Sequence, residues 1–243
     1  MSGRMEIFDI HTHVLPGIDD GAENWDMSME MLKAAWDSGV RKVIATPHFL
    51  PWDRQISPNR IRRMCREAGE RFSERYGQKI RIYPGEELYY HSELLDDLKS
   101  GRAMTMNGTD CVLVEFGVMV QYGNLLHAVQ KMQRAGYTFI LAHYERYKAL
   151  RDEAHIEELL DLGVMLQSNL EALEGGIFDP EVRRIRRDYR KGRISFAASE
   201  MHDLKARPPV QSGGVKRLSK LLDRTEARRV LYENASVIFR QPK

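Results

Sequence analysis

Ile7-Phe8-Asp9-Ile10-His11-Thr12-His13 is the stretch that decides the fold, because an apolar strand runs directly into a pair of histidines. Residues i and i+2 of a strand project from the same face, so His11 and His13 can hold one metal ion together. The sequence therefore predicts a strand that ends at a metal site.

The same arrangement recurs along the chain, with a histidine or a carboxylate just after an apolar run. The later cases are Ala45-Thr46-Pro47-His48, Tyr83-Pro84-Gly85-Glu86-Glu87, Leu113-Val114-Glu115, Leu141-Ala142-His143 and Ala198-Ser199-Glu200-Met201-His202. Asp20, in the loop after the first strand, adds a carboxylate near the same edge, although Asp and Gly also favour turns. Imidazole and carboxylate ligands suit borderline and hard divalent metals, and so many of them indicate more than one ion.

Apolar runs rich in β-branched residues alternate with amphipathic stretches throughout the chain. The predicted strands are Glu6–Ile10, Lys42–Ala45, Lys79–Tyr83, Cys111–Glu115, Thr138–Ala142, Val164–Gln167 and Ile194–Ala198. The predicted helices are Asp26–Ser38, Pro58–Tyr76, Ser92–Ser100, Tyr122–Ala135, Asp152–Leu162, Pro180–Lys191, Val215–Leu222 and Thr225–Phe239. A strand followed by a helix, repeated seven times, favours a parallel sheet in the α/β class.

Closure of that sheet into a barrel is the better of two geometries. An open doubly wound sheet gathers ligands only near one switch point, whereas here the polar residues follow at least six strands. No linker, low-complexity segment or shift in composition divides the 243 residues, so we expect one domain over residues 1–243.

The composition is that of a soluble globular protein, with 42% hydrophobic and 30% charged residues. A formal net charge of +2 argues against a dedicated nucleic-acid or membrane-surface binder. No run is long enough to cross a membrane, and the first six residues lack the apolar core of a signal peptide. Two cysteines are too few for a disulfide framework, and we expect a cytoplasmic protein.

Taken together, the motifs resemble the PHP (polymerase and histidinol phosphatase) superfamily. More narrowly, they resemble the bacterial manganese-dependent protein-tyrosine phosphatases of capsule and exopolysaccharide operons, the CpsB/YwqE type. The motifs are His11-Thr-His13, Ile18-Asp-Asp20-Gly21, Ala45-Thr-Pro-His48, Gly85-Glu-Glu87-Leu, Val114-Glu115-Phe116, Ala142-His143-Tyr-Glu-Arg146-Tyr147, and Ser199-Glu200-Met-His202 with Arg207-Pro-Pro. The resemblance spans about residues 7 to 209 and implies a distorted seven-stranded (β/α) barrel with a metal cluster at the C-terminal rim of its strands.

The resemblance also implies a ligand set for up to three manganese ions, with iron, zinc or cobalt as alternatives. The implied ligands are His11, His13, Glu87 and Glu200 for the first ion, Glu87, Glu115 and His143 for the second, and Asp20, His48 and His202 for the third. Glu200 departs from the family, which usually has Asp there, and its extra methylene forces its carboxylate to retreat or to bind differently.

The implied reaction is hydrolysis of phosphotyrosine on the tail of a bacterial tyrosine kinase that controls polysaccharide export. Arg146 and Arg207 each follow a ligand motif, and guanidinium groups match the geometry and charge of a phosphoryl group. Asp9 either orients a ligand imidazole as an outer carboxylate or simply ends the strand. Tyr89 and Tyr90 either wall the substrate cleft or pack at an interface.

Other readings stay open at this point. One is a small-molecule phosphatase acting on histidinol phosphate or a sugar phosphate, and another is a non-catalytic metal-binding module of the same fold. An oligomer is compatible with the sequence. Cys65 and Arg71 have the Cys-x5-Arg spacing of thiol-based phosphatases, but they lie in a helical pattern beside Glu67 and Glu70, which would repel a phosphate.

Overall fold

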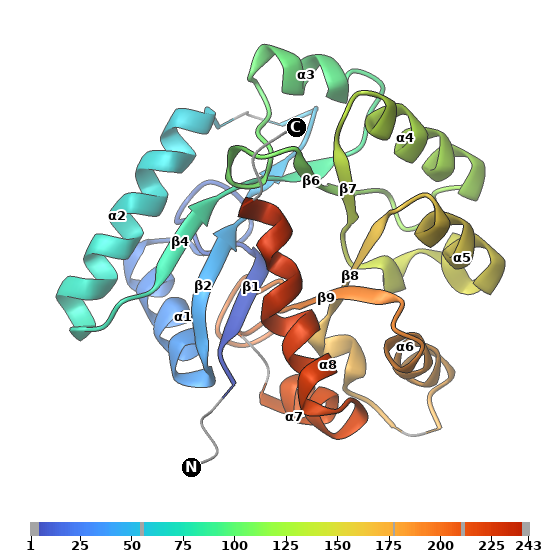
Figure 1. Ribbon diagram of the computed structural model, residues 1–243. Helices are drawn as coiled ribbons and strands as arrows, with labels where there is room; N and C mark the ends of the chain where they lie inside the picture. Colours follow the sequence, from blue (N-terminus) through green and yellow to red (C-terminus); the bar gives the residue numbers. More distant parts are fainter. Residues whose placement is uncertain (1–4, 54–55, 177, 210–211, 240–243) are drawn as a thin grey trace.

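The computed structural model of the protein describes residues 5–53, 56–176, 178–209 and 212–239. In these ranges helices surround the strands on the outside (Figure 1), and every strand pair is parallel. The strands are β1 Ile7–Thr12, β2 Val40–Ala45, β3 His48–Phe49, β4 Arg81–Pro84, β5 Glu87–Tyr89, β6 Cys111–Glu115, β7 Thr138–Leu141, β8 Met165–Asn169 and β9 Ile194–Ala198. The helices are α1 Trp25–Ser38, α2 Pro58–Tyr76, α3 Leu94–Ser100, α4 Tyr122–Arg134, α5 Glu153–Asp161, α6 Pro180–Arg190, α7 Ser212–Leu221 and α8 Arg224–Arg228, with 3-10 turns Met106–Gly108, Tyr144–Arg146, Lys148–Arg151, Leu170–Leu173 and Asn234–Phe239 and a π-helical turn Arg229–Glu233.

A strand is present at each of the seven predicted positions, and two further short strands, β3 and β5, accompany them. Both follow an interruption, at Thr46-Pro47 and at Gly85-Glu86. Pro47 has no N–H to donate to a ladder, so β2 ends before it and pairing resumes at His48. The interruptions explain why the structure has more strands than the pattern of apolar runs predicted.

The strands form two sheets, β1-β2-β4 and β3-β5-β6-β7-β8-β9. Backbone bonds link the sheets after β9, where Glu200 N–H donates to His11 O at 3.0 Å and Thr12 bridges Met201. The predicted α/β fold with parallel strands is confirmed, whereas in the described ranges the ladders do not join into the closed ring of seven strands expected from the sequence.

The inner face of the strands is apolar at one end and polar at the other. The apolar part is a buried cluster that includes Phe8, Leu113 and Phe196, and the C-terminal residues Val237 and Ile238 close it. Figure 1 shows the C-terminal helical segment lying across the strands at this end. The polar part begins where each strand ends, so the fold leaves only that end for a functional site.

Local signals explain the helices well, as α2 illustrates. The Ser57 hydroxyl accepts a hydrogen bond from Arg60 N–H at 3.4 Å, and Pro58 follows as the first helical residue. At the other end Gly77, at φ 64°, donates its N–H to Ser73 O. The helix therefore begins and ends where the sequence predicted.

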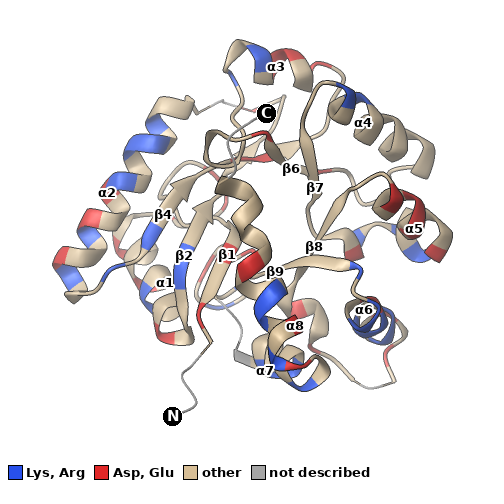
Figure 2. Cartoon of the chain, in the orientation of Figure 1, with Lys and Arg blue, Asp and Glu red and all other residues tan. Residues whose placement is uncertain are grey.

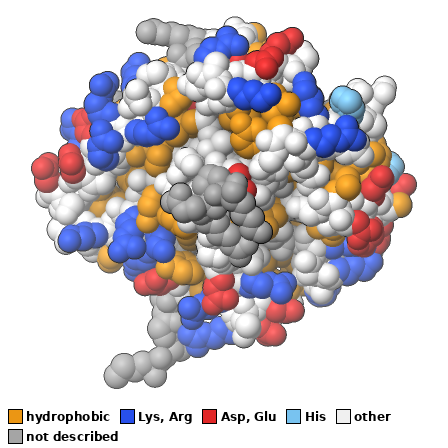
Figure 3. Space-filling model, turned by 45° about the horizontal axis from the view of Figure 1, so that its top comes forward, with side chains coloured by type: hydrophobic (Ala, Val, Ile, Leu, Met, Phe, Trp, Pro, Cys, Tyr) orange, Lys and Arg blue, Asp and Glu red, His pale blue; other side chains and the backbone are white. Residues whose placement is uncertain are grey.

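Charged side chains lie on most elements, and Lys and Arg are concentrated on α6 (Figure 2). Arg187 of α6 and Lys191, which follows it, pair with Glu153 of α5 at 2.9 and 2.7 Å. On the face in Figure 3, basic and acidic side chains are interspersed. None of the helices in the described ranges is long and apolar enough to cross a membrane.

Candidate metal centre

The nine predicted metal ligands meet at the C-terminal ends of the strands. Within the described residues their donor atoms form four groups, in each of which the atoms lie within 4.8 Å of one another. The groups are His13 with Asp20, His48 and His202; His11 with His13 and Glu87; His48 with Glu87 and Glu115; and Glu87 with His143 and Glu200. Segments far apart in the sequence thus place imidazoles and carboxylates around one small volume.

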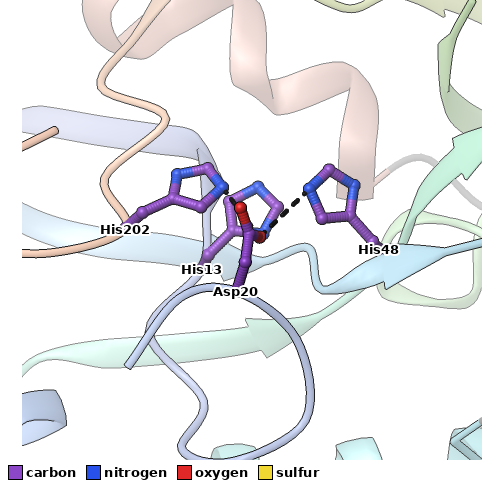
Figure 4. A group of neighbouring side chains, drawn as sticks. All are labelled: His13, Asp20, His48 and His202. Carbon is purple, nitrogen blue, oxygen red and sulfur yellow. Dashed lines mark ion pairs between the residues drawn. The ribbon is translucent and has the colours of Figure 1, made fainter. Parts of the chain in front are cut away.

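One group gathers around Asp20, in the loop after β1 (Figure 4). Asp20 Oδ1 lies 3.4 Å from Nε2 of His48 and 3.4 Å from Nε2 of His202. Hydrogen bonds from these two rings hold the pKa of Asp20 far below its ordinary range. The ring of His13 stacks on that of His202 with centroids 3.7 Å apart, so three imidazoles and one carboxylate converge.

Glu87 occupies the middle of the cluster and belongs to three of the four groups. Its Oε2 lies 3.0 Å from His11 Nε2 and 3.2 Å from His48 Nδ1, and its Oε1 lies 2.8 Å from His143 Nε2. A carboxylate with imidazoles on both oxygens has the arrangement of a ligand that bridges two ions. Glu87 is fully buried, so no solvent screens these contacts.

Gln167 of β8 determines which nitrogen of His11 faces the cluster. Its Nε2 donates to Asn169 Oδ1 at 2.8 Å, and its Oε1 accepts from His143 N–H at 2.8 Å, which fixes the orientation of the amide. Oε1 also lies 3.0 Å from His11 Nδ1, so that nitrogen carries the proton. The lone pair of His11 is therefore on Nε2, directed at Glu87.

The donor set fits divalent metal ions. Nδ1 of His13 bonds Asp19 at 2.7 Å, and its Nε2 lies 3.3 Å from Nε2 of His11. Nδ1 of His202 donates to Glu200 O at 2.7 Å, and its buried Nε2 faces Asp20 Oδ1 at 3.4 Å. Ring nitrogens and carboxylate oxygens this close together repel one another unless a positive charge, either a proton or a metal ion, lies between them.

The charges of the cluster also favour a cation. Burial alone would lower the pKa values of His13, His48 and His143, because it disfavours the charged ring. The carboxylates that face these rings outweigh burial and raise the three pKa values to about 9, 11 and 10, respectively. Burial would raise the pKa of Glu87, but the imidazoles around it lower that pKa.

Two of the candidate ligands have a strained backbone. His143 has φ 31° and Glu200 has φ 52°, both in the left-handed region that residues other than glycine rarely adopt. Each lies two residues beyond the end of a strand, β7 or β9. Strain of this kind persists only where the surroundings enforce it, and it is typical of functional sites.

The two predicted arginines lie beside the cluster, and each holds a carboxylate of it. Arg146 makes a bidentate pair with Glu200, whose second oxygen also accepts from Asn169. Arg207 Nη2 lies 2.8 Å from Asp20 Oδ2. Both guanidinium groups are partly exposed, so a phosphate that enters the site can reach them.

Sequence reasoning missed three residues that the structure brings to the site. Gln167 and Asn169 support His11 and Glu200, and Asp19, beside the predicted ligand Asp20, bonds the ring of His13. The signal for the first two is their i, i+2 spacing at the end of a strand, the same spacing as His11-x-His13.

Two other candidates lie apart from the imidazole rings. Asp9 bonds backbone N–H groups of Ser199 at 3.1 Å and of His11 at 3.4 Å, while the His11 ring is held by Gln167. Cys65 lies buried in α2, where burial raises the pKa of its thiol to about 12. Such a thiol is protonated at neutral pH and is a poor nucleophile.

The chain is similar to known proteins over nearly its whole length. The family model described as "Capsular polysaccharide synthesis, CpsB/CapC" matches residues 7–240. Tyrosine-protein phosphatase YwqE of Bacillus subtilis is 30% identical over 249 residues, which cover 97% of this chain and 95% of YwqE. Tyrosine-protein phosphatase CpsB of Streptococcus agalactiae is 28% identical over 244 residues, covering 96% of this chain and 98% of CpsB.

Solved structures show the same likeness. A crystal structure from work on YwqE of Bacillus subtilis and CpsB of Streptococcus pneumoniae, described as unique metal-dependent tyrosine phosphatases, matches with a TM-score of 0.84. It is 28% identical, and the match covers 98% of this chain and 96% of that one. The phosphotriesterase of Mycobacterium tuberculosis shares the fold alone, with a TM-score of 0.61, 12% identity and coverage of 98% and 95% of the two chains.

Proposed function

The chain belongs to the CpsB/CapC capsular polysaccharide synthesis family, and from this we propose that it is a metal-dependent phosphatase of phosphotyrosine in proteins. The observation that carries the proposal is the convergence of four imidazole–carboxylate groups and two arginines at one end of the strands. The named relatives CpsB and YwqE, similar over nearly their whole length, are tyrosine-protein phosphatases.

The proposed ligands are those expected from the sequence, for up to three ions. Manganese is the proposed metal, with iron, zinc or cobalt as alternatives, because imidazole–carboxylate sites accept all four. The ligands are His11, His13, Glu87 and Glu200 for the first ion, Glu87, Glu115 and His143 for the second, and Asp20, His48 and His202 for the third. The third set lies within the group around Asp20, which also includes His13. The other two sets are divided between groups, because Glu200 groups with His143 rather than with His11, and Glu115 groups with His48. His143 Nε2 nevertheless lies 3.6 Å from Glu115 Oε2, which supports the second set.

Bound ions of this kind supply a hydroxide nucleophile near neutral pH and neutralise charge on the phosphoryl oxygens. The side chains of the protein bind and orient the phosphoryl group of the substrate. Arg146 and Arg207 flank the cluster and bind the equatorial phosphoryl oxygens through paired N–H donors. To do so, Arg146 exchanges at least one of its bonds to Glu200 for a phosphate oxygen.

The identity of the protein substrate and the cellular compartment are also proposed from the family and its named relatives. The substrate is a phosphotyrosine-bearing bacterial tyrosine kinase of capsular or exopolysaccharide synthesis, and the protein acts in the cytoplasm. Cys65 and Cys111, both in the described ranges, form no disulfide, as is usual in a reducing compartment. We further propose that residues 1–243 form one domain whose two sheets are parts of a single distorted barrel, because backbone bonds join them after β9.

The experiment is phosphate release by manganese-loaded protein from a phosphotyrosine peptide, a phosphoserine peptide, histidinol phosphate and a sugar phosphate. Release from the phosphotyrosine peptide alone, abolished by a chelator and by His143→Ala, is the expected result. His155→Ala is the matched control, because His155 stacks on Tyr122 outside the cluster. Preference for histidinol phosphate or the sugar phosphate would indicate a small-molecule phosphatase. No turnover by metal-loaded protein would indicate a non-catalytic metal-binding module.

A further inference from the structure

An apolar groove with a volume of about 430 Å³ lies beside the metal centre. Its walls include Tyr89, Tyr90, Phe116, Met119 and Val120, and we call it the aromatic groove. None of the residues described as lining it is a lysine, arginine, aspartate or glutamate. Apart from Asn124 and His127 its lining is apolar or aromatic, so it suits an apolar occupant.

The aromatic groove is continuous with the candidate metal ligands through two neighbouring strands. Tyr89 lies two residues beyond Glu87 on β5, on the same face and about 7 Å further along the strand. It is also the register partner of Glu115 on β6, and Phe116 directly follows that carboxylate. Tyr90 N–H donates to Glu115 O at 2.9 Å, so groove and ligands are held in one rigid frame.

Exposed apolar side chains extend the groove toward solvent. Trp52 is 67% exposed and packs edge-on against Tyr89 with ring centroids 4.7 Å apart. Met119 and Val118, in the loop after β6, are 66% and 52% exposed. Trp52, Met119 and Val118 are three of the seven large apolar side chains most exposed in the described ranges, and together with an aromatic hollow they have the character of a binding surface.

We propose that the aromatic groove binds an apolar side chain next to the phosphotyrosine of a polypeptide substrate. The inference rests on the proposed function and adds a sequence preference to it. With the phosphoryl group at the metal centre and the arginines, the tyrosine ring spans the distance along β5 from Glu87 to Tyr89. The substrate backbone then passes at the level of Trp52, and the side chain beside the phosphotyrosine reaches the groove.

The test compares two phosphotyrosine peptides that differ only in the residue after the phosphotyrosine, Leu in one and Ser in the other. The wild-type protein is expected to hydrolyse the Leu peptide with a kcat/KM about tenfold higher, mainly through a lower KM. Trp52→Ala and Met119→Ser are each expected to bring the ratio of the two peptides to within about twofold. Because the ratio compares two substrates of one protein, a general loss of folding or catalysis cancels.

Phe178→Ser is the matched control, since Phe178 is 84% exposed and does not line the groove. It is expected to keep the wild-type ratio. Equal kcat/KM for the two peptides in the wild type would overturn the inference, as would a preserved ratio in both groove variants. If the protein hydrolyses neither peptide, the proposed function fails instead, and calorimetric binding of the two peptides decides the inference: equal Kd values would overturn it.

Discussion

Gln167 shows how much of the site depends on a single neutral side chain. Its amide oxygen accepts from the His11 ring and from the His143 backbone, and its amide nitrogen donates to Asn169. An amide that is fully buried and makes all three bonds leaves His11 only one ring orientation. The ligand and its tautomer are thus set before any ion binds.

Gln167→Leu is expected to weaken manganese binding about 10- to 100-fold, because the His11 ring loses the acceptor that fixes its tautomer. Isothermal titration calorimetry measures the change, and circular dichroism establishes that the variant is folded. Gln133→Leu is the control, because Gln133 lies on the surface of α4, where it bonds Leu162 O. An unchanged affinity in folded Gln167→Leu protein would show that the bond does not position the ligand.

Glu200 stands where the sequence resemblance leads us to expect Asp, and its carboxylate contacts Arg146. The resulting bidentate pair occupies the guanidinium that the proposed mechanism needs for phosphate. Glu200→Asp shortens the side chain and is expected to loosen the pair, so that inorganic phosphate inhibits about fivefold more strongly. Product-inhibition kinetics measure this, and weaker inhibition would mean that the pair positions Arg146 for phosphate rather than competing with it.

At this scale the sequence predicts which residues meet, but not how they are partnered. Histidines and carboxylates at strand ends converge whatever the details, because the ends of parallel strands share one edge. The pairing of Glu200 with Arg146 depends on side-chain lengths and on two strained backbone positions, His143 and Glu200, which no local pattern encodes.

At the scale of elements, one ionic network ties β9 to two helices. Arg193, just before β9, is only 5% exposed and bonds Asp188 of α6 at 2.7 Å and Glu153 of α5 at 2.8 Å. Hydrogen bonds from Lys191 and Arg193 lower the pKa of Glu153 to about 2. Since a lowered carboxyl pKa stabilises only the ionised form, this contribution is complete above the ordinary pKa of about 4.5 and is lost as the pH falls toward 2.

Arg193→Met is expected to lower the free energy of unfolding by about 3 kcal/mol, because it removes the nearer cation of buried Asp188 and leaves only Arg184, at 3.8 Å. Urea denaturation at pH 7 measures the loss, and Asp188→Asn in the same chain should restore part of it. The dependence of stability on pH between about 5 and 2 should also become shallower. A loss under about 1 kcal/mol would show that the network contributes little.

The elements themselves follow closely from the sequence, because hydrophobic period and caps agree at most of them. The predicted helix Pro58–Tyr76 is found with the same bounds, and all seven predicted strands are present. The short strands β3 and β5 could not be predicted, because each has only two or three residues and depends on pairing with its neighbour. Such pairing is a tertiary property rather than a local preference.

At the scale of the whole molecule, the two ends of the strands have different roles. The C-terminal residues Ala235, Val237 and Ile238 close the apolar end, and the polar end holds the candidate metal centre. The sequence predicts a final helix but not its role as a plug, because apolar spacing in a helix does not identify the surface it covers.

Ile238→Ala is expected to cost about 2–5 kcal/mol of stability, because Ile238 is fully buried in the inner cluster and its loss leaves a cavity. Differential scanning calorimetry measures the fall in Tm, while manganese affinity in the folded variant should stay within about twofold. Leu162→Ala, at a residue 36% exposed, is the control and should shift Tm far less. A Tm like that of the wild type would argue that the plug is not part of the core.

The proposed hydrolysis of phosphotyrosine requires a cluster of several metal ions at the polar end of the strands. The most direct test is to titrate manganese into chelator-treated protein and follow phosphate release from a phosphotyrosine peptide against the number of ions bound per chain. We expect no release from protein without metal and full activity only once at least two ions are bound. Turnover by protein shown to contain no metal would contradict it.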